Sequence, residues 1–207
     1  TRVLYLHIPC AWVAVLALAW SAAHSALYLG PRRLGHDDHA AAAAGLGVLF
    51  SIGATASGSL WARARWGAWW NWDPRETTVV LLLLVYGAYL ALRGAVEGEA
   101  RRARLAAVYA VLAFLTVPFL VFVAPRLYDT LHPSPIVPQP GGDGAMHPRV
   151  WIAFLAMLAG FTGLFFWMES LEVRLRRCER RASVERARRG AVPASAAAGS
   201  GPAEGGN

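Results

Sequence analysis

One stretch organises the rest of this sequence: Trp66-Gly67-Ala68-Trp69-Trp70-Asn71-Trp72-Asp73-Pro74-Arg75-Glu76-Thr77. It places four tryptophans within seven residues, directly before an apolar run, and Trp61 comes five positions earlier. Tryptophan at a membrane face commonly forms an aromatic belt at the lipid headgroups. A surface that holds a large flat aromatic ligand also needs several rings side by side. This density of indoles favours such a ligand-binding platform over an aromatic belt.

The composition is that of a membrane protein. Of 207 residues, 56% are hydrophobic and only 16% are charged. The cationic side chains are twenty arginines with no lysine, which excludes a Walker-type phosphate-binding loop. The sequence contains no Cys-x-x-Cys-His motif, so it is not a c-type cytochrome with covalent haem, and its two cysteines, Cys10 and Cys178, fall on opposite predicted sides of the membrane.

Five apolar segments are long enough to cross a hydrocarbon core of roughly 30 Å. They cover approximately residues 8–29, 40–60, 77–92, 105–124 and 150–170. Each must be helical, because a backbone surrounded by lipid has to satisfy its own hydrogen bonds. The sequence therefore predicts an all-α, polytopic membrane helical bundle over residues 1–172, followed by a basic and then disordered cytoplasmic tail over 173–207.

The distribution of arginine predicts the orientation of the bundle. The richer set falls on one side of the predicted threading, and the positive-inside rule makes that side cytoplasmic. Its members are Arg32, Arg33, Arg93, Arg101, Arg102, Arg104 and the arginines from 174 to 189. The outer face then receives the N-terminus, the tryptophan stretch and the loop at 125–149.

The second half of the tryptophan stretch predicts the start of a helix. Asp73 is a preferred N-cap, Pro74 suits the first helical position, and Glu76 completes a capping-box spacing. If residues 66–72 form a short interfacial helix, four residues share a face at spacings of three, four and seven: Trp66, Trp69, Trp70 and Asp73. Trp72 then points elsewhere.

The histidines supply a second signal. His24 lies near the cytoplasmic end of the first span and is interpreted as a packing residue. His36 and His39 have a spacing found in metal sites, but we expect them in a short solvated cytoplasmic loop, with no second cluster to complete a site. On the outer face, His7 has two possible partners, His132 and His147, between which the residues alone do not decide.

Two histidines above a tryptophan platform would suit bis-imidazole ligation of haem iron. The haem propionates would need arginine partners, since guanidinium binds carboxylates in a bidentate manner. The outer-face arginines Arg63, Arg65 and Arg126 are available, but Arg75, beside the platform, and Arg2, five residues before His7, are the predicted pair.

These motifs resemble a family, the haem-handling membrane proteins of cytochrome c maturation that carry a tryptophan-rich "WWD" segment. The most similar branch is the haem exporter protein C (CcmC) type. The resemblance extends from Arg2-Val3-Leu4-Tyr5-Leu6-His7-Ile8-Pro9 through Trp66–Asp73 to Leu127-Tyr128-Asp129-Thr130-Leu131-His132. The family has six spans, so a first span is expected to precede this sequence, which begins with Thr1.

The resemblance implies that His7 and His132 are the axial ligands of haem iron and that Arg2 and Arg75 help to hold the haem. The haem-binding residues it implies are His7, His132, Trp66, Gly67, Trp69, Trp70, Trp72, Asp73, Arg75 and Arg2. The resemblance further implies that the cargo is non-covalent haem b, held transiently at the outer face of a bacterial inner membrane, without catalysis.

The resemblance also implies partners. The haem is presented to a haem chaperone of the CcmE type, and ATP-binding-cassette subunits of the CcmA and CcmB types and a small single-span CcmD-type subunit complete the system. Membrane lipid is the remaining partner, and nucleic acid is not expected.

Two alternatives stay open at this stage. The run Trp72-Asp73-Pro74-Arg75-Glu76-Thr77 is also similar to the haem-lyase branch (CcsA and CcmF types), which would attach haem to apocytochrome c directly. From a different class, an electron-transfer membrane b-type cytochrome would need paired histidines within the spans, where the sequence offers only His24.

Overall fold

The computed structural model describes residues 3–132 and 148–191, and every regular element in these ranges is a helix. The elements are α1 (Leu4–Leu29), α2 (Leu34–Trp66), α3 (Pro74–Ala95), α4 (Glu99–Pro118), a π-helical turn η1 (Phe119–Val123), α5 (Ala124–Leu127) and α6 (Pro148–Ala191). Arg2 and His147 lie outside the described residues.

Five helical stretches are long and apolar enough to span a membrane, which confirms the predicted all-α polytopic bundle. They are Tyr5–Leu29, Leu34–Trp66, Pro74–Ala95, Glu99–Leu127 and Arg149–Arg189. All but the first span extend past the predicted segments at both ends, because helical hydrogen bonding continues into polar flanking residues that hydropathy alone leaves out.

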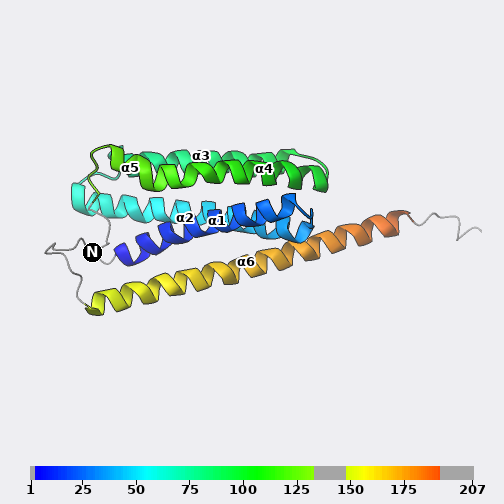
Figure 1. Cartoon of the computed structure of the whole chain (residues 1–207). Helices are drawn as coiled ribbons and strands as arrows, with labels where there is room; N and C mark the ends of the chain where they lie inside the picture. The colour runs from blue at the N-terminus through cyan, green and yellow to red at the C-terminus, as the bar shows by residue number, and fades with distance from the viewer. Residues whose placement is uncertain (1–2, 133–147, 192–207) are drawn as a thin grey trace, which may run out of the picture.

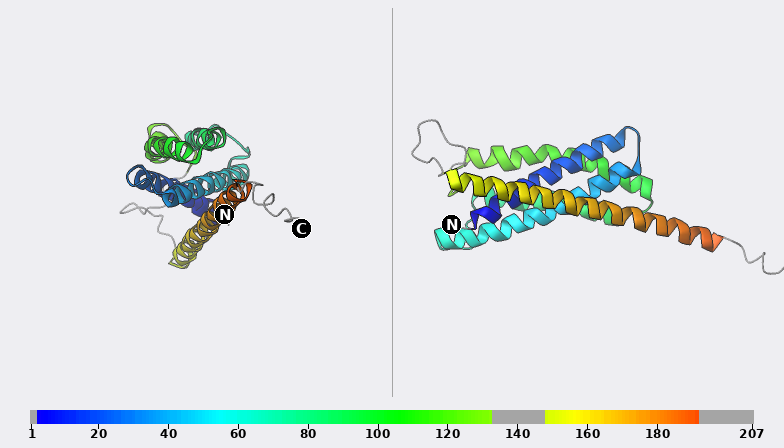
Figure 2. Two further views of the ribbon diagram at one scale, coloured as in Figure 1. Left: turned by 90° about the vertical axis from the view of Figure 1, so that its right-hand side faces the viewer. Right: turned by 90° about the horizontal axis from the view of Figure 1, so that it is seen from below.

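The helices lie in three layers (Figures 1 and 2). Helices α3 and α4 form one layer, α1 and α2 form the next, and α6 crosses beneath α1 and α2, with an ion pair from Arg180 to Glu99 at the start of α4. The start of α1, the end of α2 and the start of α3 meet at one end of the bundle, named here the tryptophan end. The opposite end, where α1 passes into α2 and α3 into α4, is named the arginine end.

Small residues allow the central helices to pack closely. Ala14, Ala17, Ala43 and Ala44 are buried between α1 and α2. A Cβ atom added to Gly47 would lie 2.5 Å from Leu18 Cδ2, so a larger residue at this crossing would force the Leu18 side chain to move. Interfaces built from Gly and Ala let helix backbones approach, which is how helices associate in lipid, where burial of apolar surface gives little driving force.

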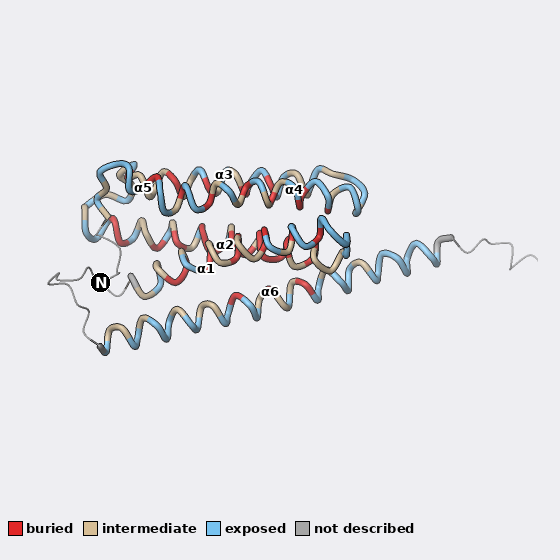
Figure 3. Tube along the Cα trace, viewed as in Figure 1, coloured by how far each residue is buried: buried red, intermediate tan, exposed pale blue. Residues whose placement is uncertain are grey.

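Helix α6 is the least buried of the long helices (Figure 3). Its 44 residues correspond to about 66 Å at 1.5 Å per residue, roughly twice the thickness of a hydrocarbon core. The basic part of the predicted tail is helical as far as Ala191. The predicted domain boundary after residue 172 falls within this helix and stays a prediction, and the predicted disorder falls on residues 192–207, which lie outside the described part.

The predicted interfacial helix over residues 66–72 is wrong. Helix α2 ends at Trp66, and Gly67 closes it in the left-handed conformation (φ 79°), with its N–H donating to the Arg63 carbonyl at 3.2 Å. Residues 67–73 have no regular helix, and Trp72 also has a positive φ of 55°. The tryptophans therefore do not share the predicted helical face.

The predicted cytoplasmic loop around His36 and His39 is also wrong, because α2 already begins at Leu34. Asp37 lies in its first turn, where a carboxylate is stabilised by the helix dipole. Both histidines are consequently packed inside the bundle end: His36 Nδ1 lies 3.2 Å from His24 Nδ1, and the His39 ring stacks on His24 at 4.7 Å. The interpretation of His24 as a packing residue agrees with these contacts.

Candidate functional site

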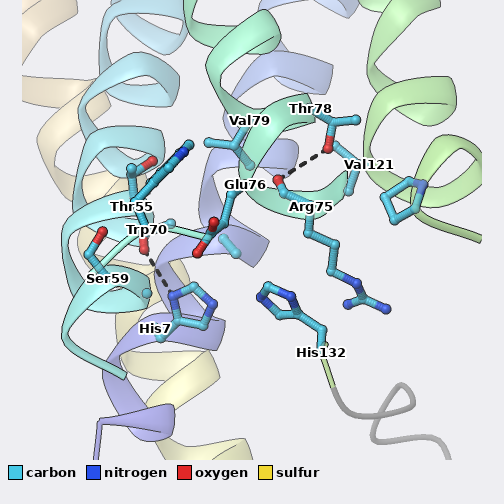
Figure 4. A pocket seen from close by; sticks show the side chains of 14 residues that line it. His7, Thr55, Ser59, Trp70, Arg75, Glu76, Thr78, Val79, Val121 and His132 are labelled. Carbon is cyan, nitrogen blue, oxygen red and sulfur yellow. Dashed lines mark hydrogen bonds between the residues drawn. The ribbon is translucent and has the colours of Figure 1, made fainter. Parts of the chain in front are cut away.

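A pocket at the tryptophan end brings His7 and His132 together, 125 positions apart in the sequence (Figure 4). His7 comes from the first turns of α1, and His132 follows α5. The cavity volume is about 170 Å³. Its lining consists of His7, Ala11, Ala54, Thr55, Gly58, Ser59, Trp70, Arg75, Glu76, Thr78, Val79, Val121, Pro125 and His132.

The His7 imidazole is held by the backbone of α2. Its Nδ1 lies 2.9 Å from the Ala54 carbonyl oxygen and 3.3 Å from Ser57 Oγ. A carbonyl oxygen only accepts, so Nδ1 carries the hydrogen and Nε2 retains its lone pair. Close approach of the ring depends on Gly58, where an added Cβ would lie 2.9 Å from His7 Cε1. The sequence analysis did not identify Gly58, because a packing contact between two helices leaves no local pattern.

The His132 imidazole is held by Asp73. Its Nδ1 lies 2.9 Å from Asp73 Oδ1, and the carboxylate is almost fully buried. The Thr130 hydroxyl donates to Asp73 Oδ2 at 2.8 Å and the Leu131 N–H donates to the same oxygen at 2.7 Å. Asp73 thus accepts hydrogen bonds from Thr130, Leu131 and His132 and holds this segment in place, in addition to its predicted role as an N-cap.

The N-cap prediction itself is confirmed. The Arg75 N–H donates to Asp73 Oδ1 at 2.9 Å, and the Asp73 N–H donates to Glu76 Oε2 at 3.3 Å, which completes the capping box. Glu76 also accepts from the Asn71 N–H at 2.9 Å. The same carboxylates therefore begin α3 and anchor the tryptophan loop at the pocket.

These contacts set the charge states of the pair. Burial alone would raise the pKa of Asp73, but the hydrogen bonds from Arg75, Thr130 and Leu131 outweigh it and hold this pKa below its ordinary value, so the carboxylate is ionised. Burial lowers the pKa of His132 below 6.5, against the opposing effect of Asp73. At neutral pH, His132 is therefore a neutral imidazole that donates from Nδ1 and offers the Nε2 lone pair.

Two indoles pack on the His132 ring. The centroid of Trp66 lies 5.2 Å from that of His132 and the centroid of Trp61 lies 5.9 Å away, with the two indoles edge to face at 4.9 Å. Trp61, which is buried, was not among the predicted site residues; its position just before the tryptophan stretch was the available signal. The contacts of these two indoles with the imidazole restrict its orientation.

The other tryptophans lie on the loop between α2 and α3. Trp70 lines the pocket, and its ring meets that of Trp72 at 5.8 Å and 90°. Trp69 and Trp72 are 56% and 74% exposed, and neither lines the pocket. Gly67 serves the loop through its left-handed backbone, without contact to the cavity.

Arg75 lines the pocket, and its guanidinium lies beside the His132 ring (Figure 4). Its Nε atom is buried and has no hydrogen-bond partner among residues 3–132 and 148–191. A buried donor without a partner is costly, so this atom is suited to an anionic group of a ligand.

The side chains of the pocket suit a metal ion that is already bound within a macrocycle. Within the described part of the chain, no group of three or more His, Cys, Asp or Glu side chains is placed to hold a bare metal ion. Two imidazoles with fixed Nδ1 atoms, an unpaired guanidinium nitrogen and adjacent indoles fit haem, whose iron needs only axial ligands from the protein.

Comparisons with known proteins agree with this fit. The model of the family described as Heme exporter protein C matches residues 1–188. The chain is 33% identical to Heme exporter protein C of Bradyrhizobium diazoefficiens over 202 residues, which cover 96% of this chain and 76% of that protein. It is 28% identical to a putative cytochrome c biosynthesis ccmC-like mitochondrial protein of Marchantia polymorpha, over 83% of this chain and 73% of that one. It is also 29% identical to Heme exporter protein C of Escherichia coli K12, over 82% and 69% respectively.

Proposed function

This chain belongs to the Heme exporter protein C family, and from that premise we propose that it holds haem between His7 and His132 and presents it to a haem chaperone. It is a multi-pass membrane protein that handles haem for cytochrome c biogenesis, and its relatives indicate a delivery component rather than an enzyme. The ligand set, the form of the haem and the recipient are the proposed parts.

The observation that carries the proposal is that two imidazoles line one pocket and that each is held by a hydrogen bond from its Nδ1 atom. His7 donates from Nδ1 to a backbone carbonyl and His132 donates from Nδ1 to a carboxylate. Hydrogen bonds of this kind fix the tautomer of metal-binding histidines and orient their rings. Both Nε2 atoms are then available as axial ligands, and haem, when bound, supplies the iron.

Arg75 is the proposed partner of a propionate. Its buried Nε has no acceptor in the described part of the chain, and a carboxylate is the acceptor that guanidinium binds best. Arg2 is proposed for the same role on the ground of the family resemblance, since it lies outside the described residues. Trp66 and Asp73 hold His132, and Trp70 lines the space beside it.

The size of the pocket supports delivery rather than permanent storage. Its volume of about 170 Å³ is below the roughly 300 Å³ at which small-molecule pockets usually begin. We therefore place the centre of the haem here and leave its outer part accessible to a recipient. Trp69 and Trp72, exposed beside the pocket, are the surface that the recipient would meet.

The proposed cargo is haem b, bound without covalent attachment, and the proposed recipient is a chaperone of the CcmE type. CcmA-, CcmB- and CcmD-type subunits are the remaining proposed partners. The site would face the periplasm or cell exterior from a bacterial inner membrane, because the arginine-rich side is expected to be cytoplasmic.

Absorption spectroscopy of the purified full chain tests the ligands. We expect a low-spin spectrum of non-covalent haem that is lost in His7→Ala and in His132→Ala. His24→Ala, which removes an imidazole at the arginine end, is the matched control and should leave the spectrum unchanged. Full haem occupancy in the His7→Ala/His132→Ala double variant would overturn the assignment.

A further inference from the structure

A second and larger cavity lies at the arginine end, away from His7 and His132. Its volume is about 1010 Å³, and it lies between the α1–α2 connection, the end of α3 and the first half of α4. It is lined by Tyr28, Arg32, Leu34, Leu92, Ala100, Arg101, Arg104, Leu105, Val108, Tyr109 and Leu112. The proposed haem function does not use this cavity.

Three guanidinium groups line its mouth. Arg101 and Arg104 stand one turn apart on α4, and Arg32 comes from the α1–α2 connection. Each is exposed, and none forms an ion pair with any carboxylate in the described part of the chain. Nearby arginines differ: Arg93 is paired with Asp37, and Arg180 with Asp38 and Glu99. The cavity therefore concentrates positive charge that the protein leaves uncompensated.

An apolar wall continues from these arginines along α4. Leu105, Val108 and Leu112 follow Arg101 and Arg104 at spacings of three and four, so all five residues occupy one face of the helix. The three apolar residues are 40%, 42% and 60% exposed. The face thus changes from cationic at the helix start to aliphatic toward the centre of the span.

Two details point into the cavity. Tyr28 is only 3% exposed and lines the cavity beneath these arginines. Arg32 has a φ of 53°, a left-handed conformation that residues other than glycine rarely adopt, and its N–H donates to the Tyr28 carbonyl at 2.9 Å. The backbone is therefore held in an unfavourable conformation at the position that contributes one of the three guanidiniums.

We propose that this cavity is a binding site for an anionic phospholipid of the adjacent leaflet. Arg32, Arg101 and Arg104 bind the phosphate of the headgroup, and an acyl chain lies along Leu105, Val108 and Leu112. Basic pockets between membrane helices are a known form of lipid recognition, and this one combines headgroup and acyl-chain chemistry on a single helix face.

The lining distinguishes a phospholipid from other anions. A free phosphate would have no use for the aliphatic wall, which extends into the span. Haem is also an anionic amphiphile, but the lining contains no His, Cys or Met, and of its two tyrosines Tyr109 already donates its hydroxyl to the Val85 carbonyl at 2.9 Å. Charge together with an extended aliphatic contact fits a phospholipid best.

Native mass spectrometry of the full chain in detergent, titrated with phosphatidylglycerol or phosphatidylcholine, tests the proposal. We expect phosphatidylglycerol to bind roughly tenfold more tightly and this preference to disappear in Arg101→Gln/Arg104→Gln. The matched control is Arg186→Gln/Arg188→Gln, which removes the same charge from the exposed end of α6 and should keep the preference. An unchanged preference in the first variant, or an equal loss in both, would overturn the site.

A second pair of variants separates cavity binding from surface charge. Val108→Trp fills the apolar wall without changing charge and should weaken phosphatidylglycerol binding severalfold, whereas Leu115→Trp, on the same helix but outside the cavity, should not. Displacement of the lipid by excess inorganic phosphate or by haem would instead assign the cavity to those ligands and overturn the proposal. The haem spectrum should be the same in all four variants, which also reports that they fold.

Discussion

Histidines and carboxylates occur at both ends of this bundle, but the two ends use them differently. At the arginine end, His24 lies against His36 and His39, and His39 Nδ1 is 2.5 Å from Glu169 Oε1. At the tryptophan end, His7 and His132 each have Nδ1 hydrogen-bonded, and neither Nε2 has a partner within residues 3–132 and 148–191. The histidines at the arginine end contact one another and Glu169. The histidines at the tryptophan end keep their Nε2 lone pairs available for a ligand.

The carboxylates show the same contrast. Asp37 is bound by both terminal nitrogens of Arg93, at 2.6 and 2.9 Å, so its charge is neutralised by a guanidinium. Among the described residues, Asp73 has no guanidinium partner and is stabilised by hydrogen bonds from neutral groups, including the His132 ring. The fully paired side chains at the arginine end therefore have a structural role, whereas the incompletely paired side chains at the tryptophan end mark the proposed haem site. Five predictions, made with four variants, test this contrast in order of decreasing expected effect.

Breaking the paired end should cost stability without affecting haem. Asp37→Ala leaves the half-buried Arg93 without its carboxylate, which destabilises proteins by about 3–5 kcal/mol. We expect a large fall in the thermal unfolding midpoint and a normal haem spectrum at low temperature. Glu185→Ala, which breaks the exposed pair with Arg189, should cost no more than about 1 kcal/mol. Loss of haem at full stability in Asp37→Ala would contradict the contrast.

Changing the hydrogen-bond partner of His132 should weaken haem binding and have little effect on stability. Asp73→Asn keeps a residue suited to the N-cap but removes the charged acceptor of the imidazole, and loss of such second-shell partners weakens metal binding by roughly 10–100-fold. Haem titration monitored by absorption measures this. Thermal unfolding should change far less than in Asp37→Ala.

The same variant has a defined pH dependence. The pKa of Asp73 is lower in the folded chain than its ordinary value of 3.8, so its ionised form contributes stability that is present above about pH 4. This contribution is lost as the pH falls through the folded-state pKa. The stabilisation that the wild type owes to the ionised Asp73 carboxylate, relative to Asp73→Asn, should therefore be present near neutral pH and shrink in strong acid.

Crowding His7 should weaken haem binding about tenfold. In Gly58→Ala, the new Cβ would lie 2.9 Å from His7 Cε1, so the ring must move. Such overpacking costs about 1–3 kcal/mol. Gly53→Ala is the control on the same helix, because its Cβ would make only an ordinary contact of 3.7 Å with Cys10 Sγ. Equal haem affinity in the two variants would argue against a ligand role for His7.

The smallest effect on the folded protein should come from the exposed indoles. Trp69 is 56% exposed, so Trp69→Ala should change stability by less than about 0.5 kcal/mol and leave haem occupancy intact. Transfer of haem to the chaperone, followed as covalently attached haem, should nevertheless fall. Trp61→Ala, at a buried ring, should instead cost about 3–5 kcal/mol. Normal transfer in Trp69→Ala would assign Trp69 to an aromatic belt.

Much of the architecture was predictable because its causes are local. The spans follow from runs of apolar residues, and the start of α3 follows from Asp73, Pro74 and Glu76 within four consecutive positions. The short helix over residues 66–72 was predicted wrongly, because a helical face was assumed where Gly67 adopts a left-handed conformation that ends α2. Spacing arguments fail once the backbone leaves the helix.

By itself, the sequence determined the membrane class, the five spans, the helix cap at Asp73 and the placement of His7 and His132 on the same side. Only the tertiary structure decided that Asp73 is the hydrogen-bond partner of His132, that the Ala54 carbonyl orients His7, and that Trp61 and Trp66 pack behind His132. Hydropathy and capping act over a few residues and can be read along the chain. The site joins residues 47 and 59 positions apart, and such contacts exist only when the helices that carry them pack together.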